Sequence, residues 1–338
     1  MPGLKVFTGS IWRAVGVEDS YWDVLTATSA SATVGLSWPV AGSSPSSYEI
    51  IVNNSITNVG LVNSHTVSGL TVGQTYSFKV RPVYSDGSTG GWSLSKNAGP
   101  TGLNAASGGT TLDVSNYNGT GQTWRVHTFE NSGTFTVTSG SVPFSYLIVA
   151  GGGGGSNWNT SSGGGGAGGL LQGTLSSLSP TNYSISIGAG GGYLVNGSNT
   201  TAFGLTAIGG GRGGNPSATS GGSGGGGSTQ GNGNVAGAAG TAGQGFAGGT
   251  SVQIDNGNMV TGGWGGGGGG AGGAGGSPAA GAGLSLNITG SSVVYAQGGS
   301  GAYFNSSVGV TGAGRGGGGG GRVGGGTAGV VIVAYRIA

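Results

Sequence analysis

Residues 144–155 read FSYLIVAGGGGG, an apolar segment suited to a buried strand that runs without a break into five glycines. A matching apolar segment, GVVIVAYRIA at residues 329–338, follows three glycines at 324–326. One buried strand thus enters the glycine-rich part of the chain and another leaves it. We therefore expect the two segments to pair and to close a single domain.

Glycine dominates what lies between these two segments. The chain has 338 residues with 88 Gly and 9 Pro, and 69 of the glycines fall after residue 150. On composition alone, such a segment is as compatible with a flexible linker as with a folded domain. Apolar strand-like pieces interrupt it, however, and the high charge of disordered tails is absent. These pieces are residues 183–187, 203–208, 284–288 and 293–296.

The spacing of the glycines predicts polyglycine-II helices packed side by side. Collagen requires Gly at every third position with abundant Pro, and the unbroken runs at 265–270 and 316–321 do not follow that period. A helix of this type has three residues per turn and no internal hydrogen bonds, so its amides must bond to neighbouring helices. We expect 265–270 and 316–321 in the interior. The Ala of 163–169 and the Arg of 209–214 should point outward from helices at the edge.

The first 104 residues predict two further parts. Residues 1–28 suit a small hairpin with Trp12 and Trp22 as anchors, either on the next domain or on a partner protein. Residues 29–104 resemble a fibronectin type III domain, with Trp38 as the buried ring and Tyr76 as the corner tyrosine. That resemblance implies a spacer or a weak binding module. Its expected strands are 32–38, 48–52, 64–67, 75–84 and 92–95.

Residues 105–338 form the third expected domain, framed by strands at 123–129, 133–137 and 144–150. The predicted fold class is therefore all-β: a fibronectin type III-like β-sandwich followed by a β-framed bundle of polyglycine-II helices.

Charge and composition argue against several classes of function. Charged residues make up 5% of the chain and the net charge is +2, so no strong field would attract nucleic acid. We expect no catalytic residue, cofactor or metal, and no insertion into a membrane. The G-x-S-x-G match at 221–225 is expected by chance in a Gly/Ser-rich segment. His65 and His127 are expected to be structural.

Five motifs in order along the chain resemble the glycine-rich domain of bacteriophage tail fibres and adhesins. This resemblance implies a virion protein made in the host cytoplasm, present in multiple copies or as a homo-oligomer, whose loops at one end of the bundle contact a glycan or protein receptor on the host. The motifs are HTFENSGTFTV (127–137), SYLIVAGGGGG (145–155), LSPTNYSISIGAGG (178–191), NITGSSVVYAQGG (287–299) and GTAGVVIVAYR (326–336).

Aromatic rings beside Asn amides interrupt the glycine runs, and these are the groups that a sugar or a protein surface requires. The alternative is that the rings only cover the ends of the bundle. Two other functions stay open: a structural head or tail decoration fibre without a specific receptor, and an ice-binding protein. The candidate receptor-binding residues are Asn157, Trp158, Asn159, Tyr193, Tyr303, Phe304 and Asn305.

Overall fold

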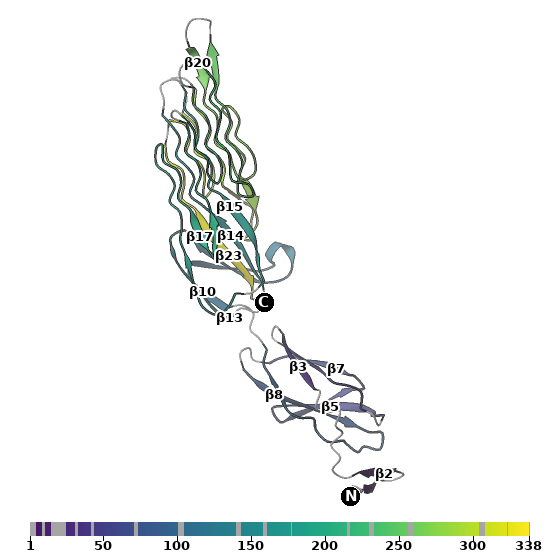
Figure 1. Cartoon of the computed structure of the whole chain (residues 1–338). Coiled ribbons are helices and arrows are strands. Elements are labelled where there is room, and N and C mark those ends of the chain that lie inside the picture. The colour runs from purple at the N-terminus through teal and green to yellow at the C-terminus, as the bar shows by residue number, and fades with distance from the viewer. Residues whose placement is uncertain are drawn as a thin grey trace. The chain divides into compact units, whose positions relative to one another are not determined.

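The computed structural model shows a chain that is almost entirely β (Figure 1). It divides into two compact units, Met1–Leu103 and Asn104–Ala338. Within the described residues, no helix is long and apolar enough to cross a membrane. The structure describes residues 5–8, 11–14, 25–30, 33–41, 44–70, 74–100, 105–139, 143–157, 161–176, 178–214, 217–229, 233–255, 260–303, 308–322 and 324–337.

The first unit contains a hairpin and two sheets with a common core. The hairpin pairs β1 (Lys5–Thr8) with β2 (Ile11–Ala14), as the sequence predicted. One sheet has the order β3-β4-β7 and the other β6-β5-β8-β9. The strands are β3 (Thr26–Ala30), β4 (Thr33–Ser37), β5 (Ser47–Val52), β6 (Ser55–Gly60), β7 (Ser64–Val67), β8 (Tyr76–Val83) and β9 (Lys96–Ala98).

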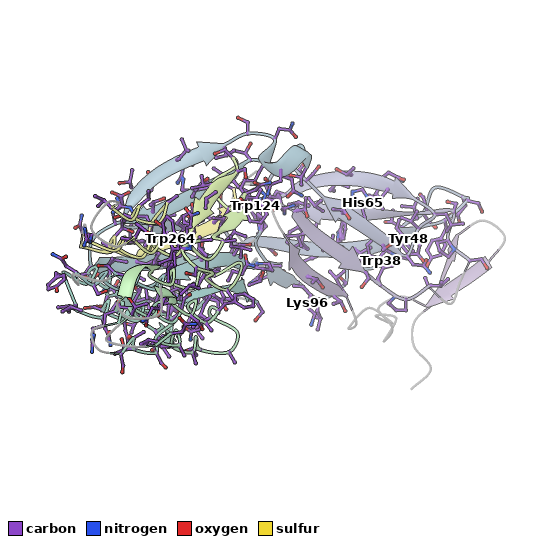
Figure 2. All side chains as sticks on the ribbon, turned by 90° about the horizontal axis from the view of Figure 1, so that it is seen from above. Trp38, Tyr48, His65, Lys96, Trp124 and Trp264 are labelled. Carbon is purple, nitrogen blue, oxygen red and sulfur yellow. The ribbon has the colours of Figure 1, made fainter. Side chains whose placement is uncertain are left out.

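The core of this unit forms because β4, β5 and β8 each place alternate apolar side chains inward. Trp38 is buried, as expected, and packs against Tyr48 with ring centroids 5.6 Å apart (Figure 2). The Tyr48 hydroxyl accepts a hydrogen bond from the amide of Ala41 at 2.9 Å. The Tyr76 hydroxyl donates a hydrogen bond to the side-chain oxygen of Gln74.

The expected strand at 92–95 is wrong, because the last strand of the sandwich begins only at Lys96. The Ser93 amide still donates to the carbonyl of Val80 at 2.8 Å. The Ser93 hydroxyl, however, accepts the hydrogen bond from the Val80 amide at 3.0 Å. A side chain thus replaces one main-chain partner, which interrupts the ladder beside Trp92. Sequence analysis also missed β3 and β6, whose residues lack a clear apolar alternation.

The second unit is framed by a five-stranded sheet, β11-β12-β23-β14-β15, and a three-stranded sheet, β10-β13-β16. The predicted pairing of the two apolar segments is confirmed, since β14 and β23 are antiparallel neighbours with Val149 opposite Val330. The framing strands are β10 (Ala105–Ser107), β11 (Thr110–Val114), β12 (Trp124–Phe129), β13 (Gly133–Ser139), β14 (Phe144–Val149), β15 (Leu170–Leu175), β16 (Asn182–Ile185) and β23 (Val330–Arg336).

The central strand β23 is buried on both faces, which explains why its sequence is continuously apolar. Val331, Val333 and Tyr335 join an aromatic core with Phe135 and Phe144. Val330, Ile332 and Ala334 join a second core that includes Ala167 and Tyr295 and lies against the glycine runs. The alternation of side chains along a strand thus supplies both cores from one segment.

Short hairpins lie between the glycine runs along the chain. The strands predicted at 183–187, 203–208, 284–288 and 293–296 are confirmed, with ends that differ by no more than two residues. The hairpins are β17 (Thr200–Ala202) with β18 (Leu205–Ala207), β19 (Val252–Asp255) with β20 (Val260–Trp264), and β21 (Leu284–Leu286) with β22 (Val293–Tyr295). A 3-10 turn, η2 (Tyr117–Gly119), completes the regular structure of the unit.

The glycine runs have the hydrogen-bonding pattern of polyglycine-II helices. Successive amides of residues 151–156 donate to three different neighbouring runs, and every third amide returns to the same neighbour. A β-strand would alternate with period two, whereas three neighbours require three residues per turn. The bonds are 151 to 198 and 154 to 195, 152 to 327 and 155 to 324, and 153 to 166 and 156 to 163, all between 2.8 and 3.0 Å.

An interior run is surrounded by six others. The amides of run 163–169 donate to 266–269, 316–319 and 208–211, and its carbonyls accept from 153–156, 223–226 and residue 299. A Cβ built on Gly154, Gly165 or Gly268 would stand closer than 3.0 Å to a carbonyl oxygen of another run. Only the glycine Cα–H fits there, where it makes a Cα–H···O contact. Glycine is therefore a packing requirement at these positions.

The predicted interior runs are confirmed, because every residue of 265–270 and 316–321 is buried. Arg212 is partly exposed, as expected of an edge run. The expectation for Ala167 is wrong, since its methyl group is fully buried. At that level the run faces the apolar core of the sheet, which includes Leu147 and Tyr295. Figure 1 shows the runs side by side between β14 and β20.

Gly268→Ala should destabilise the second unit by about 1–3 kcal/mol or more, because the methyl group has no space beside residue 165. Gly276→Ala is the matched control, since its Cβ would meet only Ala279 at 3.5 Å or more. Removing one flexible glycine there should be neutral or stabilising by about 0.4–1 kcal/mol. Thermal unfolding followed by circular dichroism compares the two variants. Equal transition temperatures would contradict the close-packed lattice.

Candidate functional site

Several glycine runs reverse direction at the end of the second unit opposite the five-stranded sheet, which we call the tip. Residues 151–156 leave β14 directly, so residue 157 lies at the far end of that run. Run 163–169 leads into β15, so its first residues also lie there. Bridges join Ser162 to Ala302 and Trp264 to Tyr303 at the same end. Figure 1 places β20 at this end, away from β10 and β13.

One aromatic pair lies at the tip beside the β19–β20 hairpin. The rings of Trp264 and Tyr303 have centroids 4.5 Å apart and an interplanar angle of 51°. The Tyr303 ring lies over Gly262, because a Cβ at that glycine would stand 2.5 Å from its hydroxyl. On the paired strand, Val252 and Ile254 are both exposed. The hairpin therefore combines an aromatic pair with exposed aliphatic side chains.

A third aromatic side chain, Tyr193, lies on another loop of the tip. Tyr193 is 48% exposed, and its hydroxyl donates to the carbonyl oxygen of Asn157 at 3.1 Å. Leu194, the next residue, has a positive φ of 54° and turns the chain back into the bundle. The loop that carries Tyr193 is thus tied to Asn157, at the end of run 151–156.

Buried hydroxyl groups fix the points from which the tip loops leave the lattice. Ser156 and Ser228 share a hydrogen bond of 2.8 Å, and Ser161 and Thr229 share one of 2.7 Å. The Ser228 hydroxyl also donates to the carbonyl of Gly214 at 2.7 Å. The side chains of Ser156, Ser161, Ser228 and Thr229 are all buried. Sequence reasoning missed them, although a Ser or Thr at the end of a glycine run is a signal that could have found them.

The structure brings some of the predicted receptor-binding residues together. Asn157 and Tyr193 are in contact, while Tyr303 packs on Trp264, which lies in β20. Trp158, Asn159, Phe304 and Asn305 lie outside the described residues, as does Trp22. For Trp12 the structure describes the main chain, which pairs with Phe7 in the hairpin.

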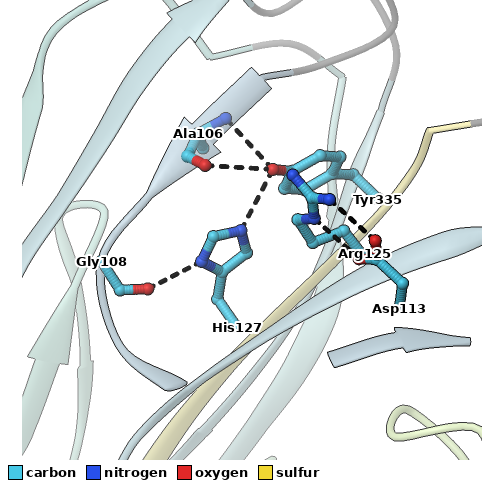
Figure 3. Close-up of polar contacts among 6 residues, drawn as sticks. All are labelled: Ala106, Gly108, Asp113, Arg125, His127 and Tyr335. Atoms are coloured by element: carbon cyan, nitrogen blue, oxygen red, sulfur yellow. Dashed lines mark hydrogen bonds and ion pairs between the residues drawn. The ribbon is translucent and has the colours of Figure 1, made fainter. Parts of the chain in front are cut away.

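A polar cluster lies at the other end of the unit, around His127 on β12 (Figure 3). Its Nδ1 is 2.7 Å from the carbonyl of Gly108, so this nitrogen carries the proton and donates. Its Nε2 is 3.0 Å from the Tyr335 hydroxyl, which donates to it in the neutral imidazole. The amide of Ala106 donates to the same hydroxyl at 3.1 Å.

A salt bridge lies next to this cluster. Arg125 donates to both carboxylate oxygens of Asp113 at 2.7 Å. This hydrogen bonding lowers the pKa of Asp113 and raises the pKa of Arg125. Burial raises the pKa of Tyr335 and lowers the pKa of His127, the latter more than the Gly108 carbonyl raises it.

The geometry around His127 supports a structural role. The imidazole is fully buried and both ring nitrogens are bonded within the protein. Through Tyr335 it ties the segment of β10 and Gly108 to the central strand β23. Within the described residues, no group of three or more His, Cys, Asp or Glu side chains is placed to hold a metal ion.

A family model described as a glycine-rich domain matches residues 127–336. No curated protein matches the chain. The matched segment begins at His127 in β12 and ends at Arg336 in β23, two strands that pair side by side. It therefore covers the second half of β12, all of β23 and the glycine runs between these two strands.

His127→Gln should remove a pH dependence of stability. Because burial lowers the pKa of His127, the unfolded chain binds a proton below about pH 6.5 that the folded chain does not. Stability of the native protein should thus fall as pH drops from about 6.5 toward the lowered pKa, and level off below it. The free energy of unfolding of the variant should be about 1 kcal/mol lower than that of the native protein at pH 7.5, because hydrogen bonds of the imidazole are lost. It should also decrease less than that of the native protein as the pH falls.

Urea midpoints at pH 7.5 and 5.0 measure this difference. His65→Gln, which removes the other imidazole of the chain, is the control and should keep the decline that comes from His127. An unchanged decline in His127→Gln would show that this imidazole titrates freely in the folded protein.

Proposed function

This chain belongs to the glycine-rich domain family, and on that premise we propose that it is a phage virion tail-fibre or tip adhesin. Its second unit would bind a glycan or protein receptor on the host cell surface through the tip loops, without catalysis. Multiple copies would be carried on the particle, which is assembled in the host cytoplasm.

The observation that carries this proposal is the arrangement of the tip. The lattice holds the loop ends in place through main-chain hydrogen bonds and the buried hydroxyls of Ser156, Ser161, Ser228 and Thr229. Aromatic side chains on these loops therefore lose little conformational freedom on binding, which favours affinity. Trp264 and Tyr303 lie at the end of the unit that carries β20, remote from β10, and Tyr193 is bonded to Asn157 at the same end. A fibre would meet a surface at this end.

The first unit fits the role of a spacer. Its sheet orders β3-β4-β7 and β6-β5-β8-β9 are those of a seven-strand sandwich and support the resemblance to fibronectin type III domains. The N-terminal hairpin, with Trp12 and Trp22, would attach the chain to other virion proteins.

The second candidate is a head or tail decoration fibre with no specific receptor. It is favoured by the same lattice, because a stiff projection needs no ligand. Purified protein distinguishes the two functions: an adhesin should compete with phage for adsorption to host cells, whereas a decoration fibre should not.

Tyr193→Ala should weaken that competition about tenfold, as expected when one aromatic anchor is lost from an interface. Phe246→Ala is the matched control, because Phe246 is equally exposed at 48% but lies near β15 at the sheet end of the unit. A combined Trp158→Ala and Phe304→Ala variant tests two further residues that the sequence predicts to bind the receptor. If all the tip variants keep the native unfolding temperature and still compete with phage as well as the native protein does, the tip is not the receptor site.

A further inference from the structure

A pocket of about 280 Å³ opens on the outer face of the sheet β6-β5-β8-β9 in the first unit. Its lining combines one aromatic ring, one aliphatic side chain, two amides, a hydroxyl and an ammonium group. The lining residues are Ile51, Asn53, Asn54, Ser77, Lys79 and Trp92.

We propose that this pocket binds an acidic sugar, a saccharide unit that carries a carboxylate. This goes beyond the proposed function, in which the first unit is only a spacer and the receptor site lies on the other unit.

The aromatic wall of the pocket is held in place before any ligand arrives. The Arg81 guanidinium lies 4.4 Å from the centre of the Trp92 ring, a cation–π contact. Glu49 holds Arg81 through bonds of 2.8 Å to Nε and 2.7 Å to Nη2. The half-buried indole therefore offers a fixed flat surface, on which the C–H face of a sugar ring packs.

The amides of the pocket are positioned by the turn between β5 and β6. Asn53 and Asn54 both have positive φ, 45° and 73°, as the two central residues of a tight hairpin turn of the primed type require. The Asn53 side-chain oxygen accepts a hydrogen bond from the Ser77 amide at 3.4 Å, which ties the turn to β8. The Asn53 amide nitrogen and the Asn54 side chain keep donors and acceptors for sugar hydroxyls.

The charge of the pocket favours an anion. Lys79 lies opposite Ile51 in the sheet and lines the pocket. Arg81, the next outward-facing residue of β8, is paired with Glu49, whereas Lys79 forms no ion pair within the described residues. A carboxylate on the ligand would supply a counter-charge for the ammonium group of Lys79, a partly buried residue.

The test uses the full chain and a tetrasaccharide that contains glucuronic acid, with the carboxyl-reduced tetrasaccharide as the neutral probe. Binding is followed by ligand-observed NMR titration. The acidic probe should bind at least about tenfold more tightly than the neutral one. Lys79→Gln should remove that difference, and Trp92→Ala should weaken the binding of both probes.

Lys96→Gln is the matched control, since Lys96 pairs with the inward-facing Phe78 and so lies on the opposite face of the sheet. It should bind the acidic probe as the native protein does, and so should Tyr193→Ala at the tip. If Trp92→Ala fails to fold, Asn54→Ala takes its place and should weaken both probes.

Three results would overturn the proposal: equal binding of the acidic and neutral probes, undiminished preference in Lys79→Gln, or equally tight binding of a tetraglutamate peptide that Lys79→Gln also abolishes. The last result would identify a site for acidic peptides. None of these results bears on the tip, so the receptor proposal stands or fails by the competition experiment alone.

Discussion

The second unit depends on one constraint: an extended chain has no internal hydrogen bonds, so each amide that is removed from water must find a carbonyl on another segment. In residues 151–156 three successive amides meet this constraint with three different runs. The runs approach so closely that a Cβ would strike a neighbouring carbonyl oxygen. The same contacts that satisfy the main chain thus exclude side chains. The conformational entropy lost when so much glycine becomes ordered is offset by many cooperative contacts between the runs, and not by the burial of apolar side chains.

A lattice made of identical glycine runs does not by itself determine which run lies beside which. The β frame supplies that information. β14 and β23 carry distinct side chains on both faces, and β23 contributes to both apolar cores. The first run, 151–156, starts from β14, and the last run leads into β23, so their positions follow from the strand pairing. The buried cluster of His127, Tyr335 and Ala106 secures the same sheet at its other end.

The frame and the chemistry of the runs could be predicted from sequence, because both follow from simple periodicities. Continuous apolar segments indicate buried strands, and glycines without a collagen period indicate lateral packing of main chains. What sequence could not show is which residue of a run faces an apolar core, and this is why Ala167 was expected outside and lies inside. Nor could it show that the Ser93 hydroxyl, instead of a main-chain carbonyl, accepts the hydrogen bond from the Val80 amide. This bond interrupts the sheet at 92–95, where a strand was expected.

For the candidate site, sequence singled out aromatic and amide residues, and the structure adds the support beneath them. Tyr193 and Asn157 were chosen separately and are joined by a hydrogen bond. Trp264 was not a candidate, yet it packs on Tyr303. The buried hydroxyls of Ser156, Ser161, Ser228 and Thr229 escaped notice because isolated Ser and Thr residues are common in glycine-rich segments, and only their placement in three dimensions pairs them.

Amide hydrogen exchange of the glycines, resolved by NMR on the full chain, tests the lattice most directly. Each amide in runs 151–155, 163–169 and 265–270 donates a hydrogen bond, so all three runs should exchange slowly and with similar protection, as a cooperative unit does. Protection that alternates with period two would indicate ordinary strands. Exchange at the rate of an unstructured chain would contradict the account altogether.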